Sequence, residues 1–192
     1  MKITALSIPD VKLIEPNVIN DKRGVFLESY SVRSFKQAGI ECAFVQDNYS
    51  LSINAGVIRG LHFQLPPFAQ AKLIWVTKGR IWDVALDLRG SSPTYGQHTS
   101  IELSHKAPQM LYIPVGFAHG FLSMEPNSEV QYKADNYYAP DHDAGILWGD
   151  PDIAIDWPIK NNDVILSDKD AALPAFADLQ NNFDYLENEN PS

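Results

Sequence analysis

The stretch LIWVTKGRIWDVALDLRG, residues 73–90, decides the fold class of this chain. Two runs of β-branched, aromatic and aliphatic residues flank Lys78–Gly79, a pattern typical of two strands joined by a turn. In the second run the side chains alternate with the two-residue period of a strand, so Asp83 and Asp87 share the face opposite Trp82. The stretch therefore predicts a β-hairpin that carries carboxylates on one face.

Similar short apolar runs recur along the chain, separated by clusters of Gly, Pro, Asn and Asp. They lie at residues 11–19, 44–53, 98–104, 110–124 and 129–138. Helix signals are confined to two segments. Residues 31–40 have Ser31 as a cap and Gly39 as a stop, whereas residues 167–179 are interrupted by Pro174. Closely spaced strands with few short helices predict a mainly β sandwich or barrel.

The composition limits the domain count and the partners. A chain of 192 residues suits one domain, 1–192, of which about the last seven residues form a polar tail. With 15 Lys and Arg against 24 Asp and Glu, the net charge of -9 disfavours nucleic acid as a partner. The only cysteine, Cys42, excludes an internal disulfide, and neither a secretory signal nor a membrane-spanning apolar run is present. We therefore expect a cytoplasmic protein with no membrane partner.

Three motifs place polar side chains where a β-rich core is expected. In GVIRGLHFQ, Arg59 and His62 interrupt an apolar strand, and in PVGFAHGF, His119 lies between glycines and aromatics. Tyr132 and Tyr138 are six residues apart, an even separation that puts both on one side of an unbroken strand. Taken alone, packing is the better explanation for His62 and for the two tyrosines, and an equal one for His119. The scarce basic residues next to Gly or apolar neighbours are candidates for a phosphate clamp: Arg23, Arg59, Lys72 and Lys169.

Metal and nucleophile signatures are missing from the sequence. The five histidines include no HxH pair and no HExxH, and a single cysteine excludes a thiolate cluster. A site of two histidines and a carboxylate from distant strands stays open, but no local pattern favours it. GxSxG, GxGxxG and Walker sequences are also absent.

Taken together, several motifs occur in a diagnostic order. They are RGVFLESY, VQDNYSLS, GVIRGLHFQ, AKLIWVTKGRIWDVALDLR, SPTYG, IPVGFAHGF, YKADNYY, ILWGDP and LSDKD. From about Ile8 to Pro174 the chain resembles the dTDP-4-dehydrorhamnose 3,5-epimerase family. The resemblance implies a cupin-type jelly-roll barrel, a homodimer, no metal or other cofactor, and epimerisation of a dTDP-linked 4-keto-6-deoxy sugar at C3 and C5.

The resemblance also implies roles for individual residues. His62 matches the general base, Tyr132 the acid on the opposite face of the sugar, and Asp170 the carboxylate that orients the histidine and favours its imidazolium. Asp83 is the reserve candidate for the role of Asp170. Lys72 matches a cation near the keto oxygen. The residues that match substrate contacts are Arg23, Glu28, Gln46, Asp47, Asn48, Arg59, His119, Tyr138, Asp143 and Lys169, part of them contributed across a dimer by an N-terminal strand.

Three features depart from the family pattern. Asp143 stands where a glutamate is usual, so its contact is one methylene shorter. Gly149 replaces an asparagine, which indicates loop variation. PPFAQAK, residues 66–72, is richer in proline and apolar groups than expected and is a candidate for a reshaped pocket rim. None of these changes affects the expected acid and base.

Other functions remain compatible with the same residues. The nearest alternative is an epimerase that acts at C3 or C5 only, or on another nucleotide 4-keto sugar. A non-catalytic sugar-nucleotide binding module and a metal-dependent cupin oxygenase are further alternatives, from different functional classes.

Overall fold

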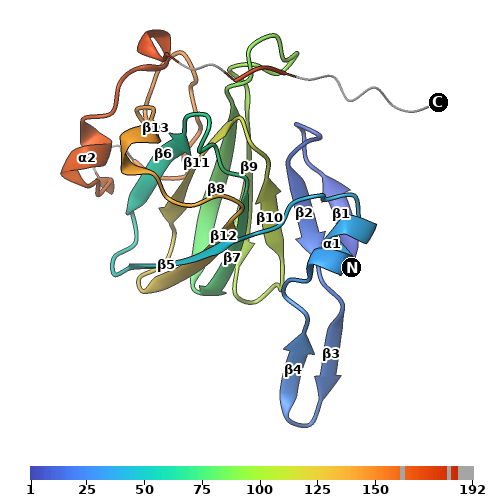
Figure 1. Cartoon of the computed structure of the whole chain (residues 1–192). Coiled ribbons are helices and arrows are strands. Elements are labelled where there is room, and N and C mark those ends of the chain that lie inside the picture. Colours follow the sequence, from blue (N-terminus) through green and yellow to red (C-terminus); the bar gives the residue numbers. More distant parts are fainter. Residues whose placement is uncertain (161–162, 181–182, 186–192) are drawn as a thin grey trace.

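The computed structural model describes residues 1–160, 163–180 and 183–185. The predicted polar tail lies outside these described residues. Antiparallel strands dominate the fold and form two main sheets (Figure 1), with a separate two-stranded hairpin. The prediction of a mainly β jelly-roll with a few short helices is confirmed.

One sheet has six strands in the order β1-β2-β10-β7-β12-β5. Their bounds are β1 Lys2–Ala5, β2 Lys12–Glu15, β10 Met110–Ile113, β7 Lys72–Lys78, β12 Ser128–Ala134 and β5 Gln46–Ser52. The second sheet has five strands in the order β13-β6-β11-β8-β9. Their bounds are β13 Asp143–Gly145, β6 Ile58–Gln64, β11 Phe117–Ser123, β8 Arg80–Asp87 and β9 His98–Ser104.

The predicted hairpin at Lys78–Gly79 is wrong. β7 pairs with β10 and β12, whereas β8 pairs with β11 and β9, so the chain changes sheets at this turn. Gly79 has φ of +75°, and a Cβ there would lie 2.4 Å from Ser128 Oγ. A turn signal between two apolar runs marks a reversal of direction, but it does not say which neighbours the two strands take.

The alternation predicted for β8 is confirmed, and both of its faces are buried. Ile81 and Ala85 belong to the core between the two sheets, which also contains Ile74 of β7. Val84 and Leu86 belong to a second core, which the segment after β13 covers. Asp83 therefore faces the space between the sheets, and it is fully buried.

Both helix predictions are confirmed. α1, Val32–Gln37, begins after Ser31, whose side chain accepts a hydrogen bond from the Ser34 amide. α2, Asp168–Ala171, begins after Ser167, and Pro174 separates it from the 3-10 helix η3, Phe176–Asp178. A further 3-10 helix, η1, spans Pro140–His142. Among the described helices, none has the length and apolar character that crossing a bilayer requires.

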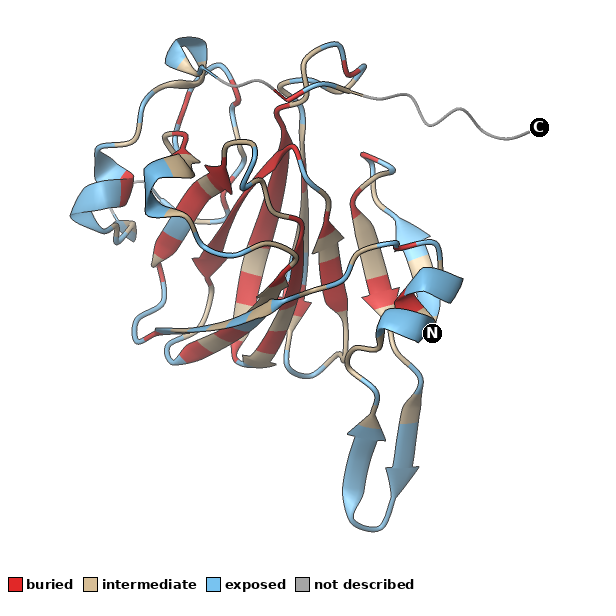
Figure 2. Ribbon diagram, in the orientation of Figure 1, coloured by how far each residue is buried: buried red, intermediate tan, exposed pale blue. Residues whose placement is uncertain are grey.

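The hairpin of β3, Val18–Asp21, and β4, Gly24–Leu27, projects away from the two sheets (Figures 1 and 2). Its surface is exposed although part of it is apolar, with Phe26 69% and Val25 64% accessible. A further core cluster, built around Phe35 of α1 and Ile14 of β2, packs on the six-stranded sheet. The hairpin therefore stands outside every packed core of the described chain.

Candidate active site

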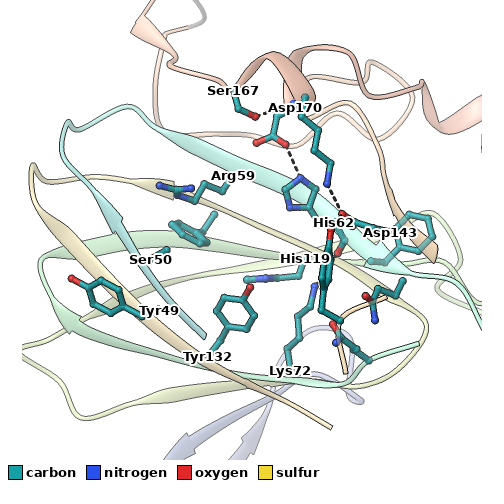
Figure 3. Close-up of a pocket in the computed structure, with 16 residues that line it drawn as sticks. Tyr49, Ser50, Arg59, His62, Lys72, His119, Tyr132, Asp143, Ser167 and Asp170 are labelled. Atoms are coloured by element: carbon teal, nitrogen blue, oxygen red, sulfur yellow. Dashed lines mark hydrogen bonds and ion pairs between the residues drawn. The ribbon is translucent and has the colours of Figure 1, made fainter. Parts of the chain in front are cut away.

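A cavity of about 400 Å³ opens between the two sheets and beneath α2 (Figure 3). Its walls bring together residues that lie more than 100 positions apart in the sequence. Among the predicted residues, the following line it: Arg59, His62, Lys72, His119, Tyr132, Tyr138, Asp143, Lys169 and Asp170. All four predicted catalytic residues therefore share one cavity.

A bulge in β6 puts Arg59 and His62 on the same wall. Three positions apart, they would face opposite ways in a regular strand. On the neighbouring strand β11, however, Phe121 pairs with Arg59 and His119 with His62, so β6 has one extra residue between them. Gly60 lies in this bulge at φ +122°, where a Cβ would lie 2.6 Å from Gly120 Cα. Only glycine fits this close approach of two backbones.

His62 is paired with Asp170 from α2. The distance from Nε2 to Oδ1 is 2.6 Å, and the Asp170 side chain is almost fully buried. Ser167 caps α2, because its Oγ accepts a hydrogen bond from the Asp170 backbone amide at 3.1 Å. Burial lowers the pKa of His62, Asp170 opposes this change, and the charges of Lys72 and Lys169 add to the lowering. His62 is therefore held as a neutral imidazole at neutral pH, which is the form that accepts a proton.

Lys72 lies on the floor of the cavity. Its Nζ donates to the backbone carbonyl of His62 at 3.1 Å. Burial lowers its pKa to about 8, although the charges of Asp143 and Asp83 oppose this change. An ammonium in this position is poorly solvated, so it interacts strongly with any negative charge that develops nearby.

Tyr132 points into the cavity from β12, on the sheet opposite His62 (Figure 3). Burial raises the pKa of its phenol, and the charge of Asp143 raises it further. Tyr132 therefore keeps its proton at neutral pH. Tyr138 also lines the cavity, but the even spacing is not the reason, because β12 ends at Ala134.

Tyr138, Asp143 and Lys169 form a cluster at the rim. Asp143 Oδ2 accepts from the Tyr138 hydroxyl at 2.9 Å and from Lys169 Nζ at 2.5 Å. Each of these two hydrogen bonds to Asp143 raises the pKa of its donor, Tyr138 or Lys169. The shorter aspartate therefore still holds both neighbours. In the predicted rim segment, Gln70 lines the cavity and Phe68 packs edge-on against His142, with 4.7 Å between ring centroids.

His119 is paired with Asp83, so Asp83 does not take the reserve role beside His62. Both carboxylate oxygens of Asp83 lie 3.0 Å from His119 Nε2. The exposed fractions of the two side chains are 8% and 0%. Two histidine–aspartate pairs thus meet in one cavity, and only the first was predicted from the sequence.

Several predicted contacts lie away from the cavity walls. Arg23 lies at the tip of the β3–β4 hairpin, paired with Asp21, and Glu28 accepts from Ser34. Asp47 points to the other face of β5 and pairs with Lys133. Residues 46 and 48 support the rim instead: Gln46 Nε2 donates to Asn48 Oδ1, and Gln46 Oε1 accepts from the Tyr138 amide.

Tyr49, Ser50 and Ser167 also line the cavity and were not predicted. Ser50 Oγ is buried and has no hydrogen-bond partner within the described part of the chain. It lies two positions after Asn48 on β5, so strand alternation was a usable signal for it. Gly149 is exposed with open space around it, in agreement with its interpretation as loop variation.

Among the described residues, no group of three His, Cys, Asp or Glu side chains is arranged to hold a metal ion. The histidines of the cavity each bind a single carboxylate through Nε2. Cys42 is a free thiol outside the cavity, and burial raises its pKa to about 12. A histidine paired with a carboxylate is an arrangement suited to moving protons, and the cavity holds two such pairs.

An imidazole on one sheet of this jelly roll faces a phenol and a buried ammonium on the other, and these three groups suit the acid–base chemistry of an isomerase. The family model for dTDP-4-dehydrorhamnose 3,5-epimerase matches residues 5–178. The chain therefore belongs to the dTDP-4-dehydrorhamnose 3,5-epimerase family.

Individual relatives agree with this assignment. The chain is 48% identical over 179 residues to the dTDP-4-dehydrorhamnose 3,5-epimerase of Pseudomonas aeruginosa, over 93% of this chain and 97% of the relative. It matches the crystal structure of dTDP-6-deoxy-D-glucose-3,5-epimerase from Legionella pneumophila in complex with dTDP-4-keto-L-rhamnose with a TM-score of 0.88 at 40% identity, over 93% and 94% of the two chains. A 3'-monoepimerase from Streptomyces bikiniensis in complex with dTDP-quinovose has a TM-score of 0.82 at 32% identity, over 90% and 87% of the chains.

Proposed function

We propose that this enzyme epimerises dTDP-4-dehydro-6-deoxy-D-glucose at C3 and C5 to give dTDP-4-dehydro-β-L-rhamnose. The observation that carries the proposal is the pairing of His62 with Asp170 in the same cavity as Tyr132, which lies on the opposite sheet. Inversion at carbon needs a proton removed from one face and another delivered to the opposite face. A base and an acid on two facing sheets meet this requirement.

His62 is the base in the proposed reaction. The 4-keto group acidifies the hydrogens on C3 and C5, and a neutral imidazole accepts one of them. Nε2 is engaged by Asp170, so Nδ1 is the nitrogen left for the substrate. Asp170 fixes the ring and stabilises the imidazolium that forms, as a carboxylate does in a catalytic triad.

Lys72 stabilises the intermediate. Removal of either hydrogen leaves negative charge on the 4-keto oxygen, as an enolate. The Lys72 ammonium lies beside His62, on the cavity floor, and is buried enough that little water competes for that charge. The enolate forms twice, once for each carbon, and the same cation serves both steps.

Tyr132 returns the proton from the opposite face. Its raised pKa keeps the phenol protonated at neutral pH, so it is ready to donate to carbon. Protonation there inverts the centre, and the proton on His62 is released to solvent. The proposed steps use side chains of the protein and assign no part to a metal or other cofactor.

The rim holds the nucleotide. Tyr138 offers an exposed ring for stacking on thymine, and Asp143 fixes its hydroxyl. Arg59 and Lys169 supply positive charge for the diphosphate. Gln46 and Asn48 stabilise this rim from β5.

We further propose a cytoplasmic homodimer in which each pocket is completed by its partner. The β3–β4 hairpin carries Arg23 and exposed apolar residues, and such a surface is unfavourable in water when unpartnered. β5 is an edge strand of the six-stranded sheet, with Tyr49 and Leu51 exposed. A partner hairpin docked along that edge brings Arg23 and Glu28 to the pocket. Light scattering is expected to give twice the mass of the chain, and a monomeric mass for the active enzyme would contradict the proposal.

Proton NMR in deuterium oxide tests the function. With dTDP-4-dehydro-6-deoxy-D-glucose, the enzyme is expected to place deuterium at both C3 and C5 of the product. Exchange at one carbon only would assign the chain to the single-position epimerases. The structure of the Streptomyces bikiniensis 3'-monoepimerase, 32% identical, shows that the fold is compatible with that alternative. No exchange at either carbon would contradict both assignments.

A further inference from the structure

A second histidine–aspartate pair lies in the cavity, and the proposed mechanism gives its carboxylate no role. Asp83 is on β8, fully buried between the sheets, and both of its oxygens contact Nε2 of His119 at 3.0 Å. His119 lines the cavity from β11, where it pairs in register with His62 of β6. Because Nε2 is engaged by Asp83, Nδ1 is the ring nitrogen available to a substrate.

Asp83 also acts on Lys72, which enters the floor from the opposite sheet. The charge of Asp83 raises the pKa of the buried ammonium. Burial raises the pKa of Asp83 itself, and His119 and Lys72 oppose this change. The charges that act on Lys72 are those of Asp143 from β13 and Asp83 from β8, and its Nζ donates to the His62 carbonyl of β6. Asp143 is shared with Lys169 and Tyr138, whereas the ion pair that Asp83 makes among the described residues is the one with His119.

A buried carboxylate needs such partners, because an uncompensated charge in the core costs several kcal/mol in typical proteins. A single cation is enough to compensate the charge of one buried carboxylate. Asp83 instead is bonded to His119 on its own sheet, and its charge also acts on Lys72 from the other sheet. Its position on a central strand, with neighbours on both sides, holds the carboxylate, and with it the His119 ring, against a rigid element.

We propose that Asp83 is a positioning residue for the epimerisation: it fixes His119 with Nδ1 towards the hexose and is the counter-ion that keeps Lys72 an ammonium opposite the 4-keto oxygen. This inference rests on the proposed function. Asp83 itself does not contact the sugar in this proposal. It acts through His119 and Lys72, which do, and its effect on enolate formation is measured as a change in kcat.

Asp83→Asn tests the proposal, because it keeps the shape of the side chain and removes its charge. We expect kcat to fall by at least about 10-fold while KM changes little. Without Asp83 the pKa of Lys72 falls further below about 8. Since Lys72 acts as the ammonium, the alkaline limb of the kcat profile is expected to move to lower pH.

Asp87→Asn is the matched control. Asp87 lies on the same strand, is equally buried, and is bound to Arg89, Ser92 and Thr94 outside the cavity. We expect it to lower the melting temperature and to leave the pH profile in place. An alkaline limb that is the same in Asp83→Asn as in the wild type, or a loss confined to KM, would overturn the proposal.

A measurement on the wild-type enzyme is independent of whether Asp83→Asn folds. The ¹⁵N spectrum, assigned with a His119→Asn variant, is expected to show a proton on His119 Nε2. A tautomer with its proton on Nδ1 alone would overturn the proposal. The deuterium experiment separates the proposed function from the role of Asp83. A wild-type enzyme without exchange contradicts the function. Normal exchange in the wild type, with the same kcat in Asp83→Asn, contradicts only the role of Asp83.

Discussion

The histidines of the two histidine–aspartate pairs, His62 and His119, are partners on the neighbouring strands β6 and β11. Their aspartates come from different kinds of element. Asp170 lies on α2, a four-residue helix, whereas Asp83 lies on β8 in the middle of a sheet. The exposed fractions of the side chains are 30% and 6% for His62 and Asp170, against 8% and 0% for His119 and Asp83. The same two residue types thus occupy an accessible site and a buried one.

This difference separates a reacting group from a supporting one. A base must reach a carbon–hydrogen bond and return its proton to solvent, so it needs the accessible position. A group that fixes its neighbours gains from burial, because little water competes for its charge. The comparison predicts that the His62 pair sets the rate and the acidic limb of the pH profile. Asp83 of the second pair is expected to set the alkaline limb through its charge on Lys72.

The largest effect is expected for His62→Ala. Without its base the enzyme is expected to lose about 10³-fold or more in kcat and to stop placing deuterium at C3 and C5, within the usual range for general-base catalysis. His98→Ala is the matched control, since His98 lies on β9 outside the cavity. Substantial residual exchange in His62→Ala, measured by NMR, would remove His62 from the role of base.

Asp170→Asn is expected to have a smaller effect, about 10- to 100-fold in kcat, because the imidazole remains but loses its orientation. The sign of the pH effect follows from the contacts. The charge of Asp170 raises the pKa of His62, so its removal lowers that pKa further. Because the base acts when neutral, the acidic limb of kcat/KM is expected to move to lower pH. A move to higher pH would show that Asp170 does not act on His62 through its charge.

The sequence predicted the barrel and most of the cavity for identifiable reasons. Period-two alternation around Asp83 correctly gave the faces of β8, and the motifs correctly brought Arg59 and His62 into one cavity. The alternation did not show that β7 and β8 join different sheets, because strand partners depend on contacts far along the chain. The bulge at Gly60 was also not predicted, although it sets the direction of His62.

The contacts of Arg23, Glu28 and Asp47 were the least predictable from one chain. Motif matching names a residue as a candidate contact but does not give the position of its side chain relative to the cavity. Arg23 lies on a projecting hairpin, and Asp47 points to the outer face of its strand. The pairing of Asp83 with His119 was not predicted for a different reason: the two residues are 36 positions apart, and no local pattern links them.

The smallest effect is expected for Ser167→Ala, which tests how α2 holds Asp170. Ser167 caps the helix through the Asp170 amide, and loss of such a cap costs about 1 kcal/mol. If the 2.6 Å contact with His62 holds the carboxylate in place, the rate is expected to fall by no more than about fivefold. Ser31→Ala, the equivalent change at α1, is expected to affect the melting temperature alone.

A loss in Ser167→Ala as large as in Asp170→Asn would mean that the cap, and not the bond to His62, positions the carboxylate. The two dyads would then differ more than their burial indicates. The accessible pair would depend on a short helix that a single hydrogen bond keeps in place, whereas the buried pair has no such dependence, because Asp83 is fixed by strands on both sides.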